Sequence, residues 1–136
     1  SNLGVILVDK EGARIFHFYM GEIVDQQEFL GSQVKQVKSG GASSEHGLRG
    51  GAMIGSQKVS ETIDRNLREI ASKASKFFDA KRVRRIMIGG TDENVSRFRA
   101  FLPKSQQSLI VRTFALNRNV NQAEIRQKVM YSINTQ

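Results

Sequence analysis

The feature that most constrains the fold of this chain is a long apolar stripe in its middle third. Its members recur in steps of three and four residues, the spacing that puts side chains on one face of an α-helix. They are Val59, Ile63, Leu67, Ile70, Ala74, Phe77 and Phe78. The stripe predicts an amphipathic helix whose start is capped by Ser56 or Ser60. Such a helix must bury its apolar face, so the chain needs a sheet or further helices to pack against it.

Three short runs before this helix have the pattern of β-strands joined by tight turns. The first, residues 3–8, is apolar throughout. The second, residues 13–20, alternates, and the alternation assigns Ile15 and Phe18 to one face. The third, residues 22–30, is weaker. Turn signals separate the runs, so we expect an antiparallel meander.

The second half of the chain alternates strand and helix patterns. Apolar runs over residues 84–90 and 108–116 predict strands. Each is followed by a predicted helix, the first capped by Thr91 and the second over residues 121–133. A strand–helix–strand unit requires parallel pairing through a right-handed crossover. The expected fold is therefore α/β, a mixed β-sheet in the order β-β-β-α-β-α-β-α with helices packed on it. This is the topology class of ribonuclease-H-like folds.

Length and composition are those of one domain with one core. The chain has 136 residues, 39% of them hydrophobic, and no cysteine. It opens with Ser1–Asn2 and no methionine, which we interpret as a cleavage scar, so residues 1–136 are expected to be a single domain excised from a longer protein. No apolar run has transmembrane length, and no signal peptide is evident. We expect a cytoplasmic protein with no membrane partner, cofactor or metal site, and with neighbouring domains in its parent chain.

The charge of the chain favours polyanions as partners. Its formal net charge is +8 and its pI is near 10.2, an excess that attracts the phosphates of nucleic acids. On the outer face of the long helix, Lys58, Arg65 and Arg68 are the candidate phosphate contacts. The alternative for these three is an ordinary solvated helix face. A denser cluster at residues 81–85 is a further candidate for phosphate contacts, and the alternative that we favour is a set of cations that complements the C-terminal end of the helix dipole.

Residues 31–52 lack periodicity and are rich in glycine, so we expect a mobile loop there. The loop joins the helix through the segment His46-Gly47-Leu48-Arg49-Gly50-Gly51-Ala52. The glycine pair lets backbone N–H groups approach a ligand closely, and the neighbouring His46 and Arg49 favour an anion. The alternative is a flexible connector that carries no chemistry.

These segments together resemble the middle domain of archaeo-eukaryotic class-one peptide chain release factors, and more closely their bacterial release-factor-like relatives. The similar parts are the opening hairpin at residues 4–15, the loop at 46–51, the long helix at 66–71, the fourth strand at 85–90, and the next helix through Phe98 and Leu102. In release factors the loop runs His-Gly-Arg-Gly-Gly-Gln. The resemblance covers nearly the whole chain.

The resemblance implies a site and a reaction. Release factors of this type hydrolyse the ester that links the peptide to tRNA on the ribosome, so it implies ribosome and tRNA as partners and Gly50, Gly51 and Ala52 as catalytic residues. In this reaction the backbone N–H after the glycines stabilises the oxyanion. Ala52 stands where the family has glutamine, so a side chain that would orient water is missing, and Gln57 is the nearest glutamine. The sequence therefore leaves open whether this domain is a hydrolase.

Two other functions stay open at this point. One is a non-catalytic interaction module of a multidomain protein, with the same fold and a loop that has lost its chemistry. The other is a metal-dependent nuclease of ribonuclease-H-like fold, in which Asp9, Glu61 and Asp92 would hold two metal ions. Against the nuclease, Asp9 lies in a turn signal and Glu61 on the outer helix face.

Overall fold

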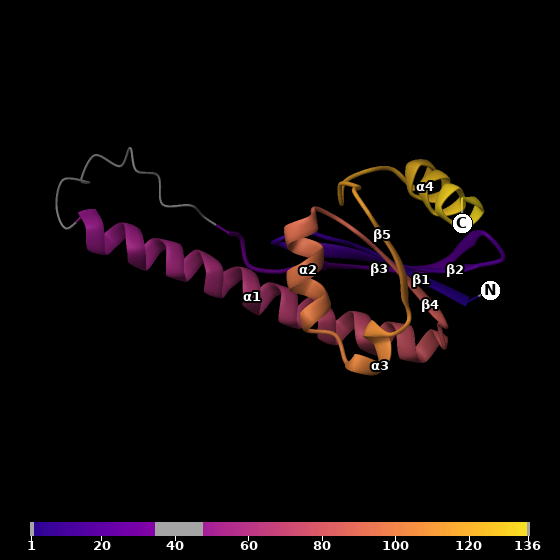
Figure 1. The fold of residues 1–136 in the computed structure, drawn as a ribbon, viewed down its shortest axis with the longest axis horizontal. Helices are drawn as coiled ribbons and strands as arrows, with labels where there is room; N and C mark the ends of the chain where they lie inside the picture. The colour runs from indigo at the N-terminus through magenta and orange to yellow at the C-terminus, as the bar shows by residue number, and fades with distance from the viewer. Residues whose placement is uncertain (1, 35–47, 136) are drawn as a thin grey trace.

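The computed structural model describes residues 2–34 and 48–135, with the backbone alone over residues 48–55. These residues form one mixed sheet with helices on both of its faces (Figure 1). The elements are β1 (Asn2–Val8), β2 (Gly12–Tyr19), β3 (Glu22–Leu30), α1 (Leu48–Lys81), β4 (Arg85–Gly89), α2 (Asp92–Ala100), α3 (Lys104–Gln107), β5 (Ile110–Phe114) and α4 (Gln122–Asn134). The predicted order is confirmed, with the short α3 added before the last strand.

The sheet has the strand order β3-β2-β1-β4-β5. β1, β2 and β3 pair antiparallel, whereas β4 pairs parallel with both β1 and β5. The expected combination of a meander with two crossovers is therefore present, and its ribonuclease-H-like designation stays a prediction. The carboxylate of Asp9 accepts the amides of Glu11 and Gly12 in the first turn. In the second turn Met20 and Gly21 both have positive φ, as a type I′ hairpin turn requires.

Both faces of the sheet are buried. α1 and α2 cover one face, which we call the α1 face, and α4 covers the other, the α4 face (Figure 1). Ile15 packs in the α1-face core, whereas Phe16 and Phe18 pack in the α4-face core. The assignment of Ile15 and Phe18 to one face was wrong, because alternation in a strand covered on both sides separates two apolar faces.

α1 is longer than its apolar stripe indicates. It begins at Leu48, so Ser56 and Ser60 lie inside the helix and the predicted N-cap is wrong. Residues 48–52 of the predicted loop also belong to the helix. With 34 residues, α1 spans about 50 Å at 1.5 Å per residue. Its N-terminal part therefore extends well beyond the sheet (Figure 1).

The helices α2 and α4 each begin directly after a polar residue whose side chain caps the helix. The Thr91 hydroxyl accepts the amide of Asn94 at 3.1 Å, which confirms the predicted cap of α2. The Asn121 side chain accepts the amide of Glu124 at 2.9 Å and caps α4. Within the described ranges, no helix has the length and apolar character needed to cross a membrane.

Candidate functional site

The segment implied by the resemblance lies at the projecting end of α1. The backbones of Gly50, Gly51 and Ala52 belong to the first turns of this helix, as does that of Arg49. His46 and most of the predicted loop fall outside the described residues. We call Leu48–Lys58 the α1 tip, because the core contacts of the described α1 side chains begin at Val59 and the N-terminal part of the helix extends beyond the sheet in Figure 1.

The helical backbone decides which amides of the α1 tip can meet a ligand. A helix that begins at Leu48 has no internal partner for the N–H groups of its first three residues, because the amide of the fourth bonds the carbonyl before the helix, as Val95 bonds Thr91 in α2. Gly50 is among these three, and Gly51 is the fourth residue. The amide of Ala52, in contrast, bonds the carbonyl of Leu48 in a regular α-helix. In this conformation the Gly50 amide points along the axis without a partner in the helix, whereas the amides of Gly51 and Ala52 serve the helix itself.

The three basic residues predicted on α1 do not share one environment. Lys58 and Arg65 are exposed and lie two turns apart on the outer face of the helix. The guanidinium of Arg68 instead stacks over the ring of Phe101, 4.8 Å from its centroid. Lys58 and Arg65 are therefore on one surface that continues from the α1 tip, whereas Arg68 turns toward the end of α2.

A buried amide and an ion pair fix the packed part of α1. The side chain of Asn66 accepts the amide of Ser32 at 2.9 Å and donates to the carbonyls of Ser32 and Lys10 at 2.8 and 3.0 Å. Arg97 of α2 donates to the Asp64 carboxylate at 2.8 Å. Sequence reasoning missed Asn66, although a polar residue next to the apolar stripe is a signal for such a role.

The three carboxylates of the nuclease interpretation are not brought together. Asp9 is engaged by its own turn and by Arg118, whose Nε donates to its carboxylate at 2.7 Å. Glu61 and Asp92 are exposed on α1 and α2. Across the residues with described side chains, no three Asp, Glu, His or Cys groups gather closely enough to hold a metal ion. Asp9 is a structural residue of the β1–β2 turn.

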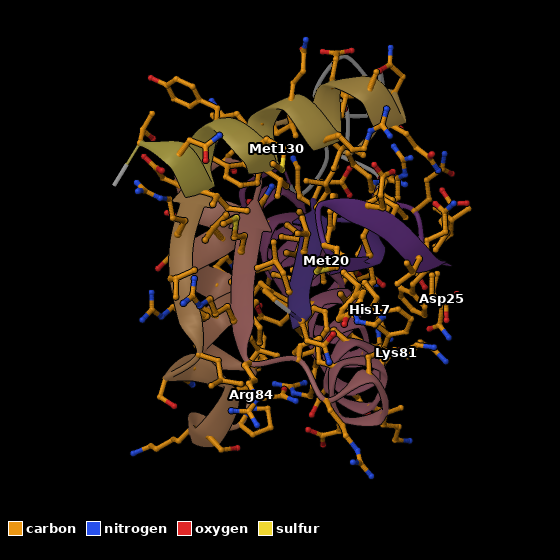
Figure 2. All side chains as sticks on the ribbon, turned by 90° about the vertical axis from the view of Figure 1, so that its right-hand side faces the viewer. His17, Met20, Asp25, Lys81, Arg84 and Met130 are labelled. Atoms are coloured by element: carbon orange, nitrogen blue, oxygen red, sulfur yellow. The ribbon has the colours of Figure 1, made fainter. Side chains whose placement is uncertain are left out.

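A second polar cluster, which the sequence did not indicate, lies near the C-terminal end of α1 (Figure 2). Lys81 forms an ion pair with Asp25 at 2.5 Å, and the hydrogen bond from Lys81 lowers the pKa of Asp25. His17 lies 3.2 Å from the side-chain oxygen of Asn2. Burial, and then the charge of Lys81, lower the pKa of His17. The cluster joins β2 and β3 to α1, so only a three-dimensional structure could reveal it.

Comparison with known proteins agrees with this fold. No curated protein matches the sequence. The chain is similar to a solved structure titled "Archaeal protein", with a TM-score of 0.64 and 11% identity over 97% of this chain and 34% of that one. It is also similar to the crystal structure of the archaeal translation termination factor aRF1, with a TM-score of 0.57 and 12% identity over 96% of this chain and 38% of that one. This chain thus spans little more than a third of either.

The family of this chain is shown by the match of its sequence to a family model. The model of the family described as bacterial archaeo-eukaryotic release factor family 10 matches residues 1–133. The match runs from β1 into the last turns of α4, so it includes every strand of the sheet. It confirms the resemblance that the opening hairpin and the Gly50–Gly51 segment indicated. The chain belongs to bacterial archaeo-eukaryotic release factor family 10.

Proposed function

We propose that this release-factor-like domain binds tRNA on the ribosome through the α1 tip and does not hydrolyse the peptidyl-tRNA ester. The projection of α1 carries this proposal. The helix holds Gly50–Gly51 at its outer end, while its core contacts begin at Val59 among the described side chains. A helix that projects beyond the sheet can enter a narrow RNA-lined space that the body of the domain cannot. This role places the protein in the cytoplasm.

The chemistry of the α1 tip suits a phosphate. The amides of the first helical turn and the positive end of the helix dipole favour an anion at this position. The glycines remove side chains that would keep a phosphate away from these amides. Lys58 and Arg65 extend the same surface with two exposed cations. The net charge of +8 speeds encounter with RNA.

The same geometry argues against ester hydrolysis. Catalysis of acyl transfer requires a donor aimed at the developing oxyanion and a water held in line for attack. Ala52 has no side-chain group that could hold water. Its amide belongs to a helix that begins at Leu48, so it becomes a free donor only if the first turns unwind. Binding requires neither of these features.

Binding can be tested with the natural full-length protein and purified ribosomes that carry tRNA. The Lys58→Gln/Arg65→Gln variant should weaken binding and reduce the dependence of log affinity on log salt by about 1 for each phosphate that is no longer neutralised. The matched control is Lys104→Gln/Lys128→Gln, which changes charge equally away from the α1 tip. Equal effects from the two pairs, or none from either, would refute binding through the α1 tip.

Hydrolysis needs a separate assay. Ribosomes that carry a labelled peptidyl-tRNA are incubated with wild type, with Gly51→Ala and with Ala52→Gln, and released peptide is measured. We expect no release above background by wild type or by Gly51→Ala. Release by wild type that Gly51→Ala abolishes would overturn the non-catalytic part of the proposal and support a hydrolase. Release by Ala52→Gln but not by wild type would support the non-catalytic proposal. It would show that the wild-type protein lacks activity because it lacks the glutamine side chain.

A further inference from the structure

The end of the molecule opposite the α1 tip, which faces the viewer in Figure 2, contains a groove of about 320 Å³. It lies on the α4 face, where β1 and β4 begin and the β2–β3 turn comes close to α4. Its floor consists of core side chains, Leu3, Phe18, Met87 and Val129. Its rim consists of exposed aliphatic side chains, Met20, Val111 and Ile133. We call this the end-face groove. An apolar hollow with such a rim can receive a large aliphatic side chain.

Cations surround the end-face groove. Arg85 and Arg112 line it. Arg82 and Arg84 lie beside it, because their backbones bond to Asn2, another lining residue, at 3.4 and 3.0 Å. None of these arginines forms an ion pair with any described side chain.

The acidic residues of this end are already engaged. Asp25 pairs with Lys81, and Glu22 pairs with Arg126 of α4 at 3.1 Å. Among the described side chains, the arginines around the groove therefore have no carboxylate partner. A partner that supplies carboxylates would satisfy them, and would gain in rate and specificity of association from the complementary charge.

Two strained residues support a role for this end. Met20 and Arg82 have φ of 55° and 56°, and they are the non-glycine residues with positive φ in the described part of the chain. Glycine is favoured at such positions, both in a type I′ turn and directly after a helix. Met20 is nevertheless 73% exposed, and Arg82 is exposed as well. The fold tolerates strain at both positions and displays there one apolar side chain, Met20 (labelled in Figure 2), and one cationic side chain, Arg82.

We propose that the end-face groove is the docking site of an acidic segment of a partner protein, which inserts a large aliphatic side chain between the β2–β3 turn and α4. A second copy of this chain fits poorly, because it also carries a net charge of +8. RNA fits poorly too, since the aromatic residue that lines the groove, Phe18, is buried and offers no face for base stacking. Methionine at the rim suits a protein partner, because its flexible side chain adapts to different shapes.

A display library of short random peptides provides the probe. Peptides are selected on the wild-type protein after removal of those that bind the Arg84→Glu/Arg85→Glu variant. We expect the recovered peptides to combine aspartate or glutamate with leucine, isoleucine, methionine or phenylalanine. Amide shifts in NMR spectra should map their binding to β1, the β2–β3 turn and α4. Recovered peptides without acidic residues, or amide shifts elsewhere on the molecule, would overturn the proposal.

Substitutions then separate docking from folding. Met20→Gly should weaken binding of a selected peptide at least about tenfold without lowering Tm, because glycine relieves the positive φ. Leu30→Ser, at an exposed aliphatic residue at the far end of β3, and Lys10→Glu/Arg99→Glu are the matched controls and should leave affinity nearly unchanged. Equal losses in the controls would refute docking at the groove. Displacement of the peptide by single-stranded RNA, sensitive to Met20→Gly, would replace the protein partner with RNA.

Discussion

The two faces of the sheet are both buried, but they are covered to different extents. On the α1 face, α1 and α2 lie side by side over one continuous core. On the α4 face, a single helix of 13 residues covers a smaller core and leaves the end-face groove open. The comparison shows a division of roles. The α1 face holds a long helix firmly enough to project its tip, whereas the α4 face keeps apolar surface accessible.

The largest expected effect tests this difference with one side chain on each face. Ile70 of α1 and Ile125 of α4 are both fully buried. Ile70→Ala should lower the free energy of unfolding by about 4 kcal/mol, and Ile125→Ala by about 2 kcal/mol. The second cost is smaller because α4 is the single helix over its core and can move into the space that the removed atoms leave. Urea denaturation measures both, and equal losses would mean that the two faces are packed equally well.

The second prediction concerns how α1 is fixed to the sheet. Asn66→Ala removes three hydrogen bonds to Ser32 and Lys10. We expect a loss of about 2–3 kcal/mol, because partly buried backbone groups lose their partners. A side chain added at Gly31 would collide with that of Asn66, so Gly31→Ala should disturb the same contact.

A double-mutant cycle in urea controls this interpretation. Gly31→Ala combined with Asn66→Ala should cost less than the sum of the two single changes, since both act on one contact. Additive losses would show that Asn66 does not hold the segment after β3. The cycle therefore reports on the attachment of α1 and not on the general sensitivity of the core.

Local patterns predicted most of the fold. β3 was predicted over residues 22–30 and has these bounds, and the Thr91 cap was identified from its sequence alone. Both depend on residues that are neighbours in the chain. The start of α1 could not be predicted in this way, because its first turns contain Gly50 and Gly51, which weaken the local preference for helix. The face of Phe18 was assigned wrongly although Phe18 follows Ile15 by three residues, a spacing that places the two side chains on opposite faces of a strand.

The candidate sites differ in the same way: those that depend on local spacing could be predicted, and those that depend on contacts between distant segments could not. Lys58 and Arg65 were expected on the outer face of α1 and are exposed there, because helical spacing is a local property. The role of Gly50–Ala52 came from the family resemblance and stays a prediction. The end-face groove was beyond prediction, since its lining comes from β1, β2, β4, β5 and α4. The arginines at its edge were noticed but interpreted as partners of the helix dipole, although Arg84 and Arg85 lie past the end of α1.

Smaller effects are expected at the helix caps of the two faces. Thr91→Ala and Asn121→Ala each remove one side-chain bond to a backbone amide, at a cost of about 1 kcal/mol. The two substitutions should differ in how far the increase in hydrogen exchange spreads from the cap. Hydrogen exchange should rise through α2 and into α1 for Thr91→Ala, because α2 packs against α1, whereas Asn121→Ala should affect α4 and the groove alone. Thr91→Ser and Asn121→Asp are the controls, since both keep an acceptor, and exchange that rises equally throughout the protein in both alanine variants would contradict this separation.

The smallest effect is a pH dependence at the edge of the α1 face. Burial and the charge of Lys81 hold the pKa of His17 below its ordinary value of 6.5. The folded state therefore binds this proton less readily than the unfolded state. The contribution to stability is complete above pH 6.5 and is lost as pH falls from there through the lowered pKa of the folded state. His17→Gln should remove this loss, so the difference in unfolding free energy between wild type and variant, measured by urea denaturation at several pH values, isolates it.

Lys81→Gln is the companion change, because it should raise the pKa of His17 toward the ordinary value, which an NMR titration of the imidazole reports. The exposed Glu22–Arg126 pair on the α4 face provides the contrast, and Arg126→Gln should leave the pH dependence near neutrality unchanged. A wild-type protein that gains stability relative to His17→Gln as pH falls below 6.5 would contradict the assigned direction.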